Sequence, residues 1–433
     1  MRHRISTAIG KSVKRLSALR GGGSALPGLV VEKLDTNYMA RVLSTLPRGV
    51  VLISGTNGKT TTTKMVVALL ESQGLTVFTN RTGSNFTRGV TASLLGEVDA
   101  RGKLAADIAV LELDEAHAVH FVKHVPPTHA LFLNVMRDQL DRFGEIDTTA
   151  SLLHEVAVRT TDHVVINRDD PRLASQHFLH NLQAAISTYG VDESLLSDFP
   201  SDDALRPGAA TSQSAGRLTS MPSTLAVDDT CLAALSGSTA HIRFNNHVRI
   251  VTLSLRGIYN VHNAVGAIAI VRAIMKDNLD EPAMLQALSQ VTPAFGRGEI
   301  IHIDDIQCEL ILVKNPSGFR LGLNSFDSKD VDVMIAINDD YADGRDMSWL
   351  WDVDFSSLVP HIAIASGTRA YDMALRLQYD AVECSMVEPT LTTALDYLLH
   401  RHHNPTKRIF CTYTAMIALR RALSKQTTVE AIR

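Results

Sequence analysis

The chain carries short, continuous runs of apolar residues, separated by segments long enough to form helices. A strand buried on both faces needs apolar side chains at every position, whereas a strand with one wet face alternates. The pattern therefore predicts an α/β fold, with a largely parallel sheet between layers of helices. The clearest runs are GVVLIS (49–54), LTVFTN (75–80), DIAVLEL (107–113), HALFLNV (129–135) and HVVIN (163–167).

This pattern breaks between residues 184 and 240. The stretch is rich in Ser, Pro, Ala, Thr and Asp, a composition that predicts a long loop or a partly disordered insertion. Regular structure is expected to return with HIRFNNHVRIVTLSL, as a hairpin, and with NVHNAVGAIAIVRAIM, as a helix.

The chain is too long for one hydrophobic core, because 433 residues exceed what a single core usually organises. After AFGRGEI (294–300) the alternation of strands and helices resumes with CELILV, VDVMIAIN, HIAIAS and KRIFCTY. We predict three parts: a lead-in at 1–47 with a basic helix, a central α/β domain at 48–297 and a smaller α/β domain at 298–433.

Composition narrows the class of protein. The net charge of −4 provides no electrostatic case for a nucleic-acid partner. No apolar run of about 18 residues is evident, so no transmembrane helix is expected. The cysteines are far apart and form no C-x-x-C pair, which argues against a zinc ribbon and favours a reducing cytoplasm; they are Cys231, Cys308, Cys384 and Cys411.

The first twenty residues form a basic segment with no acidic residue. Ile5, Ile9, Val13 and Leu16 fall at helical spacing, and no continuous apolar stretch suggests a secretory signal. We expect a helix with a solvated basic face. The alternative is a helix that lies on an anionic membrane surface.

The stretch VVLISGTNGKTTTT, residues 50–63, predicts a strand that enters a phosphate-binding turn. The strict pattern G-x-x-x-x-G-K-[ST] fails, because its first position is Ile53. Glycines still allow close approach to an anion, and a helix expected from about Lys59 to Ser72 directs its positive end there. Lys59 would contact the phosphates, and the Thr60 hydroxyl would bind Mg²⁺.

A second buried strand ends in acids that could complete this site. VLELDEAH contains Glu112, Asp114 and Glu115, and Mg²⁺ prefers one or two carboxylates with phosphate oxygens and water. We favour Glu112 because it comes first after the apolar run. The alternative is that these acids stabilise the start of the next helix.

Together these features resemble the Mur ligase superfamily, and specifically its MurT branch, over nearly all of the chain except 184–240. The resemblance implies a Mur-ligase-like P-loop domain with a parallel sheet, followed by a smaller α/β domain. The shortened loop occurs across the superfamily, whereas RDQLDRFGE and ADGRDMSWLWD are more specific to the branch. Further matching motifs are SALPG, NRTGSN (80–85), LELDEA, NRDDP, GIYNVHNAVGA, GRGE, VKNPSGF and NDDYADGRDMSWLWDVDF.

The resemblance also implies roles for individual residues. Lys59 would hold the β- and γ-phosphates of ATP, Arg297 would contact the γ-phosphate, and Thr60 with Glu112 would hold Mg²⁺. The substrate would contact Asn80, Thr82 and Asn85. ATP would be bound by Thr56, Asn57, Gly58, Lys59, Thr60, Thr61, Asn260, Asn263 and Arg297.

Three of these residues have ordinary structural alternatives. Asn260 could be a helix N-cap, and Arg297 could be a solvated loop charge. By the resemblance, Asp346 would reach a partner glutaminase and orient its histidine, in a Cys-His-Asp set shared by two chains. Its alternative is an Asx-turn before SWLW, and Asp352 is the second choice for the role.

The chain departs from the family pattern in two places. Amino-acid-adding Mur ligases read D-H where this chain reads Asp138-Gln139, and IDTTASLLHEVAV offers no lysine where those enzymes place a carbamylated one. The resemblance therefore does not carry their second-metal arrangement to this chain. Many MurT sequences insert a four-cysteine zinc ribbon, but only Cys231 lies in that part of this chain, so we predict no structural zinc.

The implied activity is ATP-dependent amidation of the D-glutamate of lipid II through an acyl phosphate. The ammonia would come from a GatD-like glutamine amidotransferase, since no cysteine here sits in a recognisable nucleophile motif. ATP and Mg²⁺ are the implied cofactors, and the enzyme would work in the cytoplasm at the inner face of the plasma membrane. The rival interpretations are a stand-alone amino-acid or folylpolyglutamate ligase, a non-catalytic nucleotide-binding scaffold and a P-loop GTPase.

Overall fold

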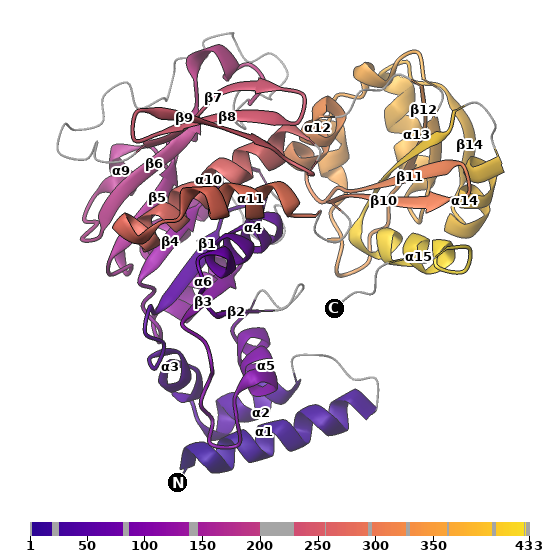
Figure 1. The fold of residues 1–433 in the computed structure, drawn as a ribbon. Helices are drawn as coiled ribbons and strands as arrows, with labels where there is room; N and C mark the ends of the chain where they lie inside the picture. The colour runs from indigo at the N-terminus through magenta and orange to yellow at the C-terminus, as the bar shows by residue number, and fades with distance from the viewer. Residues whose placement is uncertain are drawn as a thin grey trace.

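The structure is a computed structural model that describes residues 2–19, 26–80, 86–137, 146–199, 229–255, 257–292, 297–325, 330–361, 363–400, 404–427 and 429. Figure 1 shows two sheets, each with helices on both faces, joined in one chain. The α/β fold predicted from the apolar runs is confirmed.

The first sheet has nine strands in the order β2-β3-β1-β4-β5-β6-β7-β8-β9. The strands from β2 to β7 pair in parallel, and β8 and β9 extend the edge in antiparallel register, as the hairpin prediction required. The strands are β1 (Val50–Ser54), β2 (Val77–Thr79), β3 (Ile108–Glu112), β4 (His129–Phe132), β5 (His163–Asn167), β6 (Ala185–Val191), β7 (Asp229–Ser236), β8 (Thr239–Phe244) and β9 (His247–Thr252).

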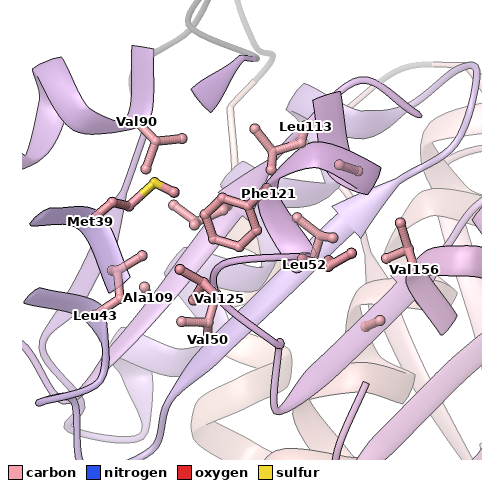
Figure 2. Close-up of a cluster of buried hydrophobic side chains, with 14 of the residues drawn as sticks. Met39, Leu43, Val50, Leu52, Val90, Ala109, Leu113, Phe121, Val125 and Val156 are labelled. Atoms are coloured by element: carbon pink, nitrogen blue, oxygen red, sulfur yellow. The ribbon is translucent and has the colours of Figure 1, made fainter. Parts of the chain in front are cut away.

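Helices cover both faces of this sheet, and β1 explains why. Val50 and Leu52 point into one core, while Val51 and Ile53 point into another. The first core packs against α2 (Leu26–Leu34), α3 (Tyr38–Leu43), α5 (Thr87–Glu97), α6 (Glu115–Val122) and α8 (Ile146–Val158), and Figure 2 shows Phe121 at its centre. The second packs against α4 (Lys59–Ser72), α10 (Ile258–Met275) and α11 (Glu281–Gln290).

The prediction of a loop over 184–240 is wrong at both ends. Residues 185–191 form β6, whose burial is nearly complete, and residues 229–240 form β7 and the start of β8. The prediction extended the loop over two strands of the sheet, because the polar composition of the residues between them dominates this stretch. Residues 200–228, the centre of the predicted insertion, lie outside the described residues. Short elements nearby are α9 (Gln176–Leu179) and η1 (Glu193–Leu195).

Helix α10 is the central helix of the second core. Its apolar composition and length, taken over Ile258–Asn278 with η2 (Lys276–Asn278), would suffice to cross a membrane. However, 83% of that window is buried inside the protein, where α10 packs between the first sheet and α4. The helix predicted over NVHNAVGAIAIVRAIM is therefore confirmed, and it is a core helix.

The second sheet has six strands in the order β10-β11-β15-β12-β13-β14, all parallel except β10. Its strands are β10 (Arg297–Ile303), β11 (Ile306–Leu312), β12 (Val331–Ala336), β13 (Ala363–Ser366), β14 (Cys384–Glu388) and β15 (Thr406–Cys411). One face packs on α12 (Pro316–Ser325), α13 (Ala370–Tyr379), η3 (Ser348–Asp352) and η4 (Ser356–Leu358), and the other on α14 (Leu391–His400) and α15 (Tyr413–Leu423).

The N-terminal helices lie apart from the second sheet. Helix α1 (Arg2–Leu19) packs against α2 and α5 at the end of the molecule away from α12 to α15 (Figure 1). Helix α2 approaches α5 closely, because a Cβ at Gly28 would lie 2.0 Å from the carbonyl oxygen of Arg88. Glycine therefore sets the distance between these helices.

We expect Gly28→Ala to lower the free energy of unfolding by about 1–3 kcal/mol. The added methyl group would collide with the backbone of Arg88, which can give way only if α5 shifts. Urea unfolding would measure the change. The matched control is Gly322→Ala in α12, where the nearest heavy atoms to an added Cβ lie at 3.5 Å. Equal stability of the Gly28 variant and the wild-type protein would contradict the close approach.

Candidate active site

The turn between β1 and α4 contains two glycines with left-handed backbone. Gly55 has φ of 133° and Gly58 has φ of 91°, conformations that other residues rarely adopt. A Cβ at Gly58 would also lie 2.5 Å from Oδ1 of Asn263, so only glycine fits there. Gly58 precedes α4 without a side-chain cap. The first amides of α4 and its positive end are thus available to an anion.

The segment after β4 holds this turn in place. The Asn57 N–H donates to Oδ1 of Asn134 at 2.9 Å, and Nδ2 of Asn134 donates back to the Asn57 carbonyl at 3.0 Å. The Thr56 hydroxyl donates to the Met136 carbonyl and accepts from the Met136 N–H. The backbone of the turn is therefore fixed before a ligand arrives.

Lys59 is buried at the base of the turn. Its ammonium donates to the Gly55 carbonyl at 2.6 Å and forms an ion pair with Asp114 at 3.2 Å. Burial alone would raise the pKa of Asp114, but the positive charges of Lys59 and Lys314 outweigh it, so the pKa is lowered. Asp114 stays ionised and holds the lysine in a defined position.

The predicted magnesium ligands lie side by side. The Thr60 hydroxyl donates to Oε1 of Glu112 at 2.8 Å. Asn80 exchanges two hydrogen bonds with the backbone of Glu112, at 2.8 and 2.9 Å, and so fixes the end of β3. One hydroxyl and one carboxylate oxygen at the phosphate turn suit Mg²⁺, which takes its remaining ligands from phosphate and water. The residues present fit the ion.

A pocket opens beside the turn. Asn57, Gly58, Thr61 and Asn263 line one side of it. On another side, the ring of His262 lies 5.1 Å from the ring of Tyr189 and 5.6 Å from that of Phe199, between centroids. Aromatic walls with a few converging polar groups suit a flat heterocycle such as a nucleotide base.

The second sheet's domain supplies the opposite wall of this pocket. Lys314 and Asn315 follow β11, and the Lys314 ammonium donates to the Thr56 carbonyl at 3.0 Å. The amides of Asn315 and Asn57 exchange hydrogen bonds at 3.2 and 3.4 Å. The Gly318 N–H donates to Oδ1 of Asn315 at 2.7 Å, which holds that amide in position. The pocket therefore depends on both domains.

Some of the other predicted site residues lie in the described part of the structure, and others do not. Asn260 is fully buried in α10, whose N-cap is Gly257, so the N-cap interpretation of Asn260 is wrong. Arg297 is the first residue of β10, and its side chain lies outside the described residues. Thr82 and Asn85 also lie outside them. The same is true of Asp138 and Gln139.

The two candidate acids of the second domain differ in their contacts. Oδ1 of Asp346 accepts the Ser348 N–H at 2.9 Å, which is the Asx-turn that the structural alternative predicted. Asp352 turns its carboxylate toward the first domain, where Arg137 lies 3.5 Å away. Asp346 is therefore better placed than Asp352 to face another chain.

Several residues of the site were not singled out from the sequence. Asn134, Lys314 and Asn315 contact the turn, and His262 lines the pocket. Each lies just beyond a strand or in the first turns of a helix, where α/β folds place ligands. That position was a usable signal, but it does not say which polar residue faces the turn.

His262 provides a test of the pocket. Burial, with the charge of Arg168 second, lowers its pKa from 6.5 to about 4. Within the described part of the chain, its buried Nε2 has no hydrogen-bond partner. As pH falls, His262 is protonated in the unfolded chain before it is protonated in the folded protein. The free energy of unfolding is therefore highest above the pKa of the unfolded state, and it decreases as the pH falls from that pKa to the pKa of the folded state.

We therefore expect the wild-type protein to lose about 2 kcal/mol more unfolding free energy than His262→Phe between about pH 7 and about pH 5. Phenylalanine retains a ring beside Tyr189 and Phe199 but does not titrate. Urea unfolding at each pH would measure the difference. Parallel pH profiles for the two proteins would show that His262 is not held neutral by the fold.

Comparisons with known proteins agree with this geometry. The family model described as Mur ligase middle domain matches residues 53–271, and that described as MurT ligase C-terminal matches residues 312–416. Among solved structures, MurF from Acinetobacter baumannii superposes with a TM-score of 0.68 at 20% identity, covering 92% of this chain and 81% of that one. MurF from Thermotoga maritima, solved with ADP, superposes with a TM-score of 0.60 at 16% identity, covering 93% and 85%.

Curated relatives match over almost the whole chain. The protein named lipid II isoglutaminyl synthase (glutamine-hydrolyzing) subunit MurT of Streptococcus pneumoniae is 30% identical, across 97% of this chain and 96% of its own. The protein of the same name from Staphylococcus aureus is 27% identical, across 89% and 90%. The family expected from the sequence motifs is confirmed: this chain belongs to the MurT family of the Mur ligases.

Proposed function

We propose that this chain is the ATP-dependent ligase subunit of a two-subunit enzyme of peptidoglycan synthesis. It would amidate the D-glutamate α-carboxylate of lipid II, giving D-isoglutamine, at the cytoplasmic side of the membrane. The observation that carries this proposal is the match to MurT proteins along nearly the whole chain, with the phosphate turn and the Thr60–Glu112 pair intact. A nucleotide-binding scaffold would need no such arrangement.

The chemistry explains why a phosphate site is needed. An ionised carboxylate has no good leaving group, so its oxygen first forms a bond to the γ-phosphorus of ATP while the bond to the bridging oxygen breaks and ADP leaves. Ammonia then forms the C–N bond, phosphate departs with the C–O bonding electrons, and the nitrogen loses a proton. Charge that develops on the phosphoryl oxygens must be stabilised by preorganised cations and N–H groups.

The residues of the site divide this work. Lys59 and the first amides of α4 would contact the phosphates, and Arg297 would contribute a second cation at the γ-phosphate. Mg²⁺ held at Thr60 and Glu112 would supply further positive charge. Asn263 and His262 would contact the base or ribose. Because Asp114 and the Gly55 carbonyl already position Lys59, little reorganisation is needed on binding.

The cysteines support a separate source of ammonia. A thiol nucleophile needs exposure and a lowered pKa. Burial instead raises the pKa of Cys308 to about 11 and raises that of Cys384, and Cys411 is fully buried in β15 with its pKa raised as well. Cys231 is buried in β7 and accepts hydrogen bonds from two arginines. We therefore assign glutamine hydrolysis to a GatD-like partner chain.

Asp346 would serve that partner. Its carboxylate is partly exposed, and its Oδ1 accepts the Ser348 N–H. Hydrogen bonds from the side chain and the backbone of Ser348 hold the pKa of Asp346 below its usual value, so the carboxylate stays ionised. These bonds are compatible with a further role for the second oxygen. Across an interface this oxygen could orient a histidine and stabilise its charged form.

The overall proposal predicts a defined product. Lipid II incubated with ATP, glutamine, this chain and its glutaminase should become lighter by the difference between a hydroxyl and an amino group, as measured by mass spectrometry. Lys59→Met should abolish this conversion while the glutaminase subunit still binds. A gain in mass equal to a whole amino acid would instead indicate an amino-acid ligase, and conversion by Lys59→Met at the wild-type rate would refute the phosphate site.

Asp346→Asn separates the two activities. We expect glutamine-driven amidation to fall about a hundredfold or more, because asparagine cannot stabilise a charged histidine, while ammonia-driven amidation is unchanged. Asparagine can still accept the Ser348 N–H, so the turn is preserved. The matched control is Asp354→Asn, since Asp354 makes the same turn with the Ser356 N–H at 2.8 Å. Equal loss with both nitrogen sources would refute the role.

A further inference from the structure

Helix α1 exposes large apolar side chains on its outer face. Ile5, Ile9 and Leu16 are 52%, 38% and 57% exposed, and their spacing of four and seven residues places them on one face. Ser12 and Arg15 are exposed on the same face. We propose that this outward face of α1, defined by Ile5, Ile9, Ser12, Arg15 and Leu16, docks on an anionic membrane surface.

The side of α1 that faces the protein is small or polar. Ser6, Thr7 and Ser17 are buried, and Gly10 packs so closely that a Cβ there would lie 2.5 Å from Val31. An ordinary amphipathic surface helix directs its apolar stripe inward. In α1 the arrangement is reversed, so the large apolar side chains contribute little to the fold and remain available outside it.

Specific contacts fix the rotation of α1. The Lys14 ammonium donates to the Ala92 carbonyl at 3.0 Å, and that of Lys11 donates to the Val98 carbonyl at 2.5 Å. Val98 is the C-cap of α5, where the helix dipole favours a cation, and Ala92 lies in the middle of that helix. The Thr7 hydroxyl donates to the Tyr38 hydroxyl at 3.3 Å. With these bonds formed, Ile5, Ile9 and Leu16 must point outward.

Charge selects a membrane as the occupant. The first twenty residues contain six basic residues and no acidic one, in a chain whose net charge is −4. Lys11 and Lys14 bond to the protein, whereas Arg15 is exposed on the outward face itself. Such a segment is attracted to anionic lipid headgroups within about one Debye length, ~10 Å at moderate salt. Apolar side chains next to basic ones on a helix are typical of helices that lie in the membrane interface. Helix α1 also lies along the outer edge of the molecule (Figure 1).

The benefit of docking α1 on a membrane rests on the proposed function, because the proposed substrate, lipid II, is held in a membrane. An enzyme docked through α1 would search for its substrate along a surface rather than through the bulk solution. The vesicle measurement that follows does not depend on that purpose.

The test compares wild-type protein with the variant Ile5→Ser/Ile9→Ser/Leu16→Ser, by flotation with vesicles of equal parts phosphatidylglycerol and phosphatidylcholine. We expect the wild-type protein to bind and the triple variant to bind at least about tenfold more weakly. The matched control is Val248→Ser/Ile250→Ser on β9, where both side chains are exposed, at 48% and 62%, far along the chain from α1. Thermal unfolding should show that all three proteins are folded.

Two further measurements test which forces produce the vesicle binding and whether it affects turnover. High salt and vesicles of phosphatidylcholine alone should both weaken binding of the wild-type protein, since the attraction is partly electrostatic. The triple variant should turn over a short-chain, water-soluble lipid II analogue normally, but should need about tenfold more lipid II embedded in vesicles. Failure of the wild-type protein to amidate either substrate would contradict the proposed function and leave the vesicle result standing.

The proposal is overturned if the wild-type protein does not bind anionic vesicles, or if the triple variant binds them equally well. It is also overturned if the triple substitution leaves vesicle binding intact but releases the glutaminase subunit or separates a dimer of this chain, because the outward face of α1 would then cover a protein.

Discussion

The left-handed backbone of Gly58 is the constraint on which the site depends. It turns the chain from β1 into α4 within four residues, and the close approach of Asn263 allows no side chain there. The first amides of α4, the Lys59 ammonium and the Thr60 hydroxyl consequently converge at one end of the sheet. Glu112 reaches the same end because β3 lies beside β1 in parallel register, with Ile53 opposite Glu112.

The second domain closes the site through a small number of polar contacts. The paired amides of Asn57 and Asn315 and the bond from Lys314 to the Thr56 carbonyl join the phosphate turn to the loop after β11. The negative charge of Asp114 is stabilised by Lys59 and by Lys314, so it interacts with cations from both domains. A nucleotide in the pocket would touch both domains, and domain movement on binding would follow from that geometry.

The proposed division of labour is visible in where reactive groups lie. The phosphate chemistry is concentrated at the carboxyl ends of the parallel strands, as expected for this class of sheet. The thiols of Cys308 and Cys411 are buried among apolar residues, which suits packing rather than catalysis. Asp346 lies on a turn of the second domain, and the outward face of α1 lies on the first. These two surfaces could serve two different partners at once.

Elements with a strong local signal could be predicted from the amino-acid sequence. Continuous apolar runs marked β1 and β3, and the glycine-lysine-threonine pattern marked the turn and the extent of α4, from Lys59 to Ser72. Only the tertiary structure showed that residues 185–191 form a strand and that Gly257, not Asn260, caps α10. It alone revealed that Asn134 and Asn315 hold the turn and that α1 directs its apolar side outward. Those features depend on contacts between residues far apart in the chain, whose pairing local periodicity does not encode.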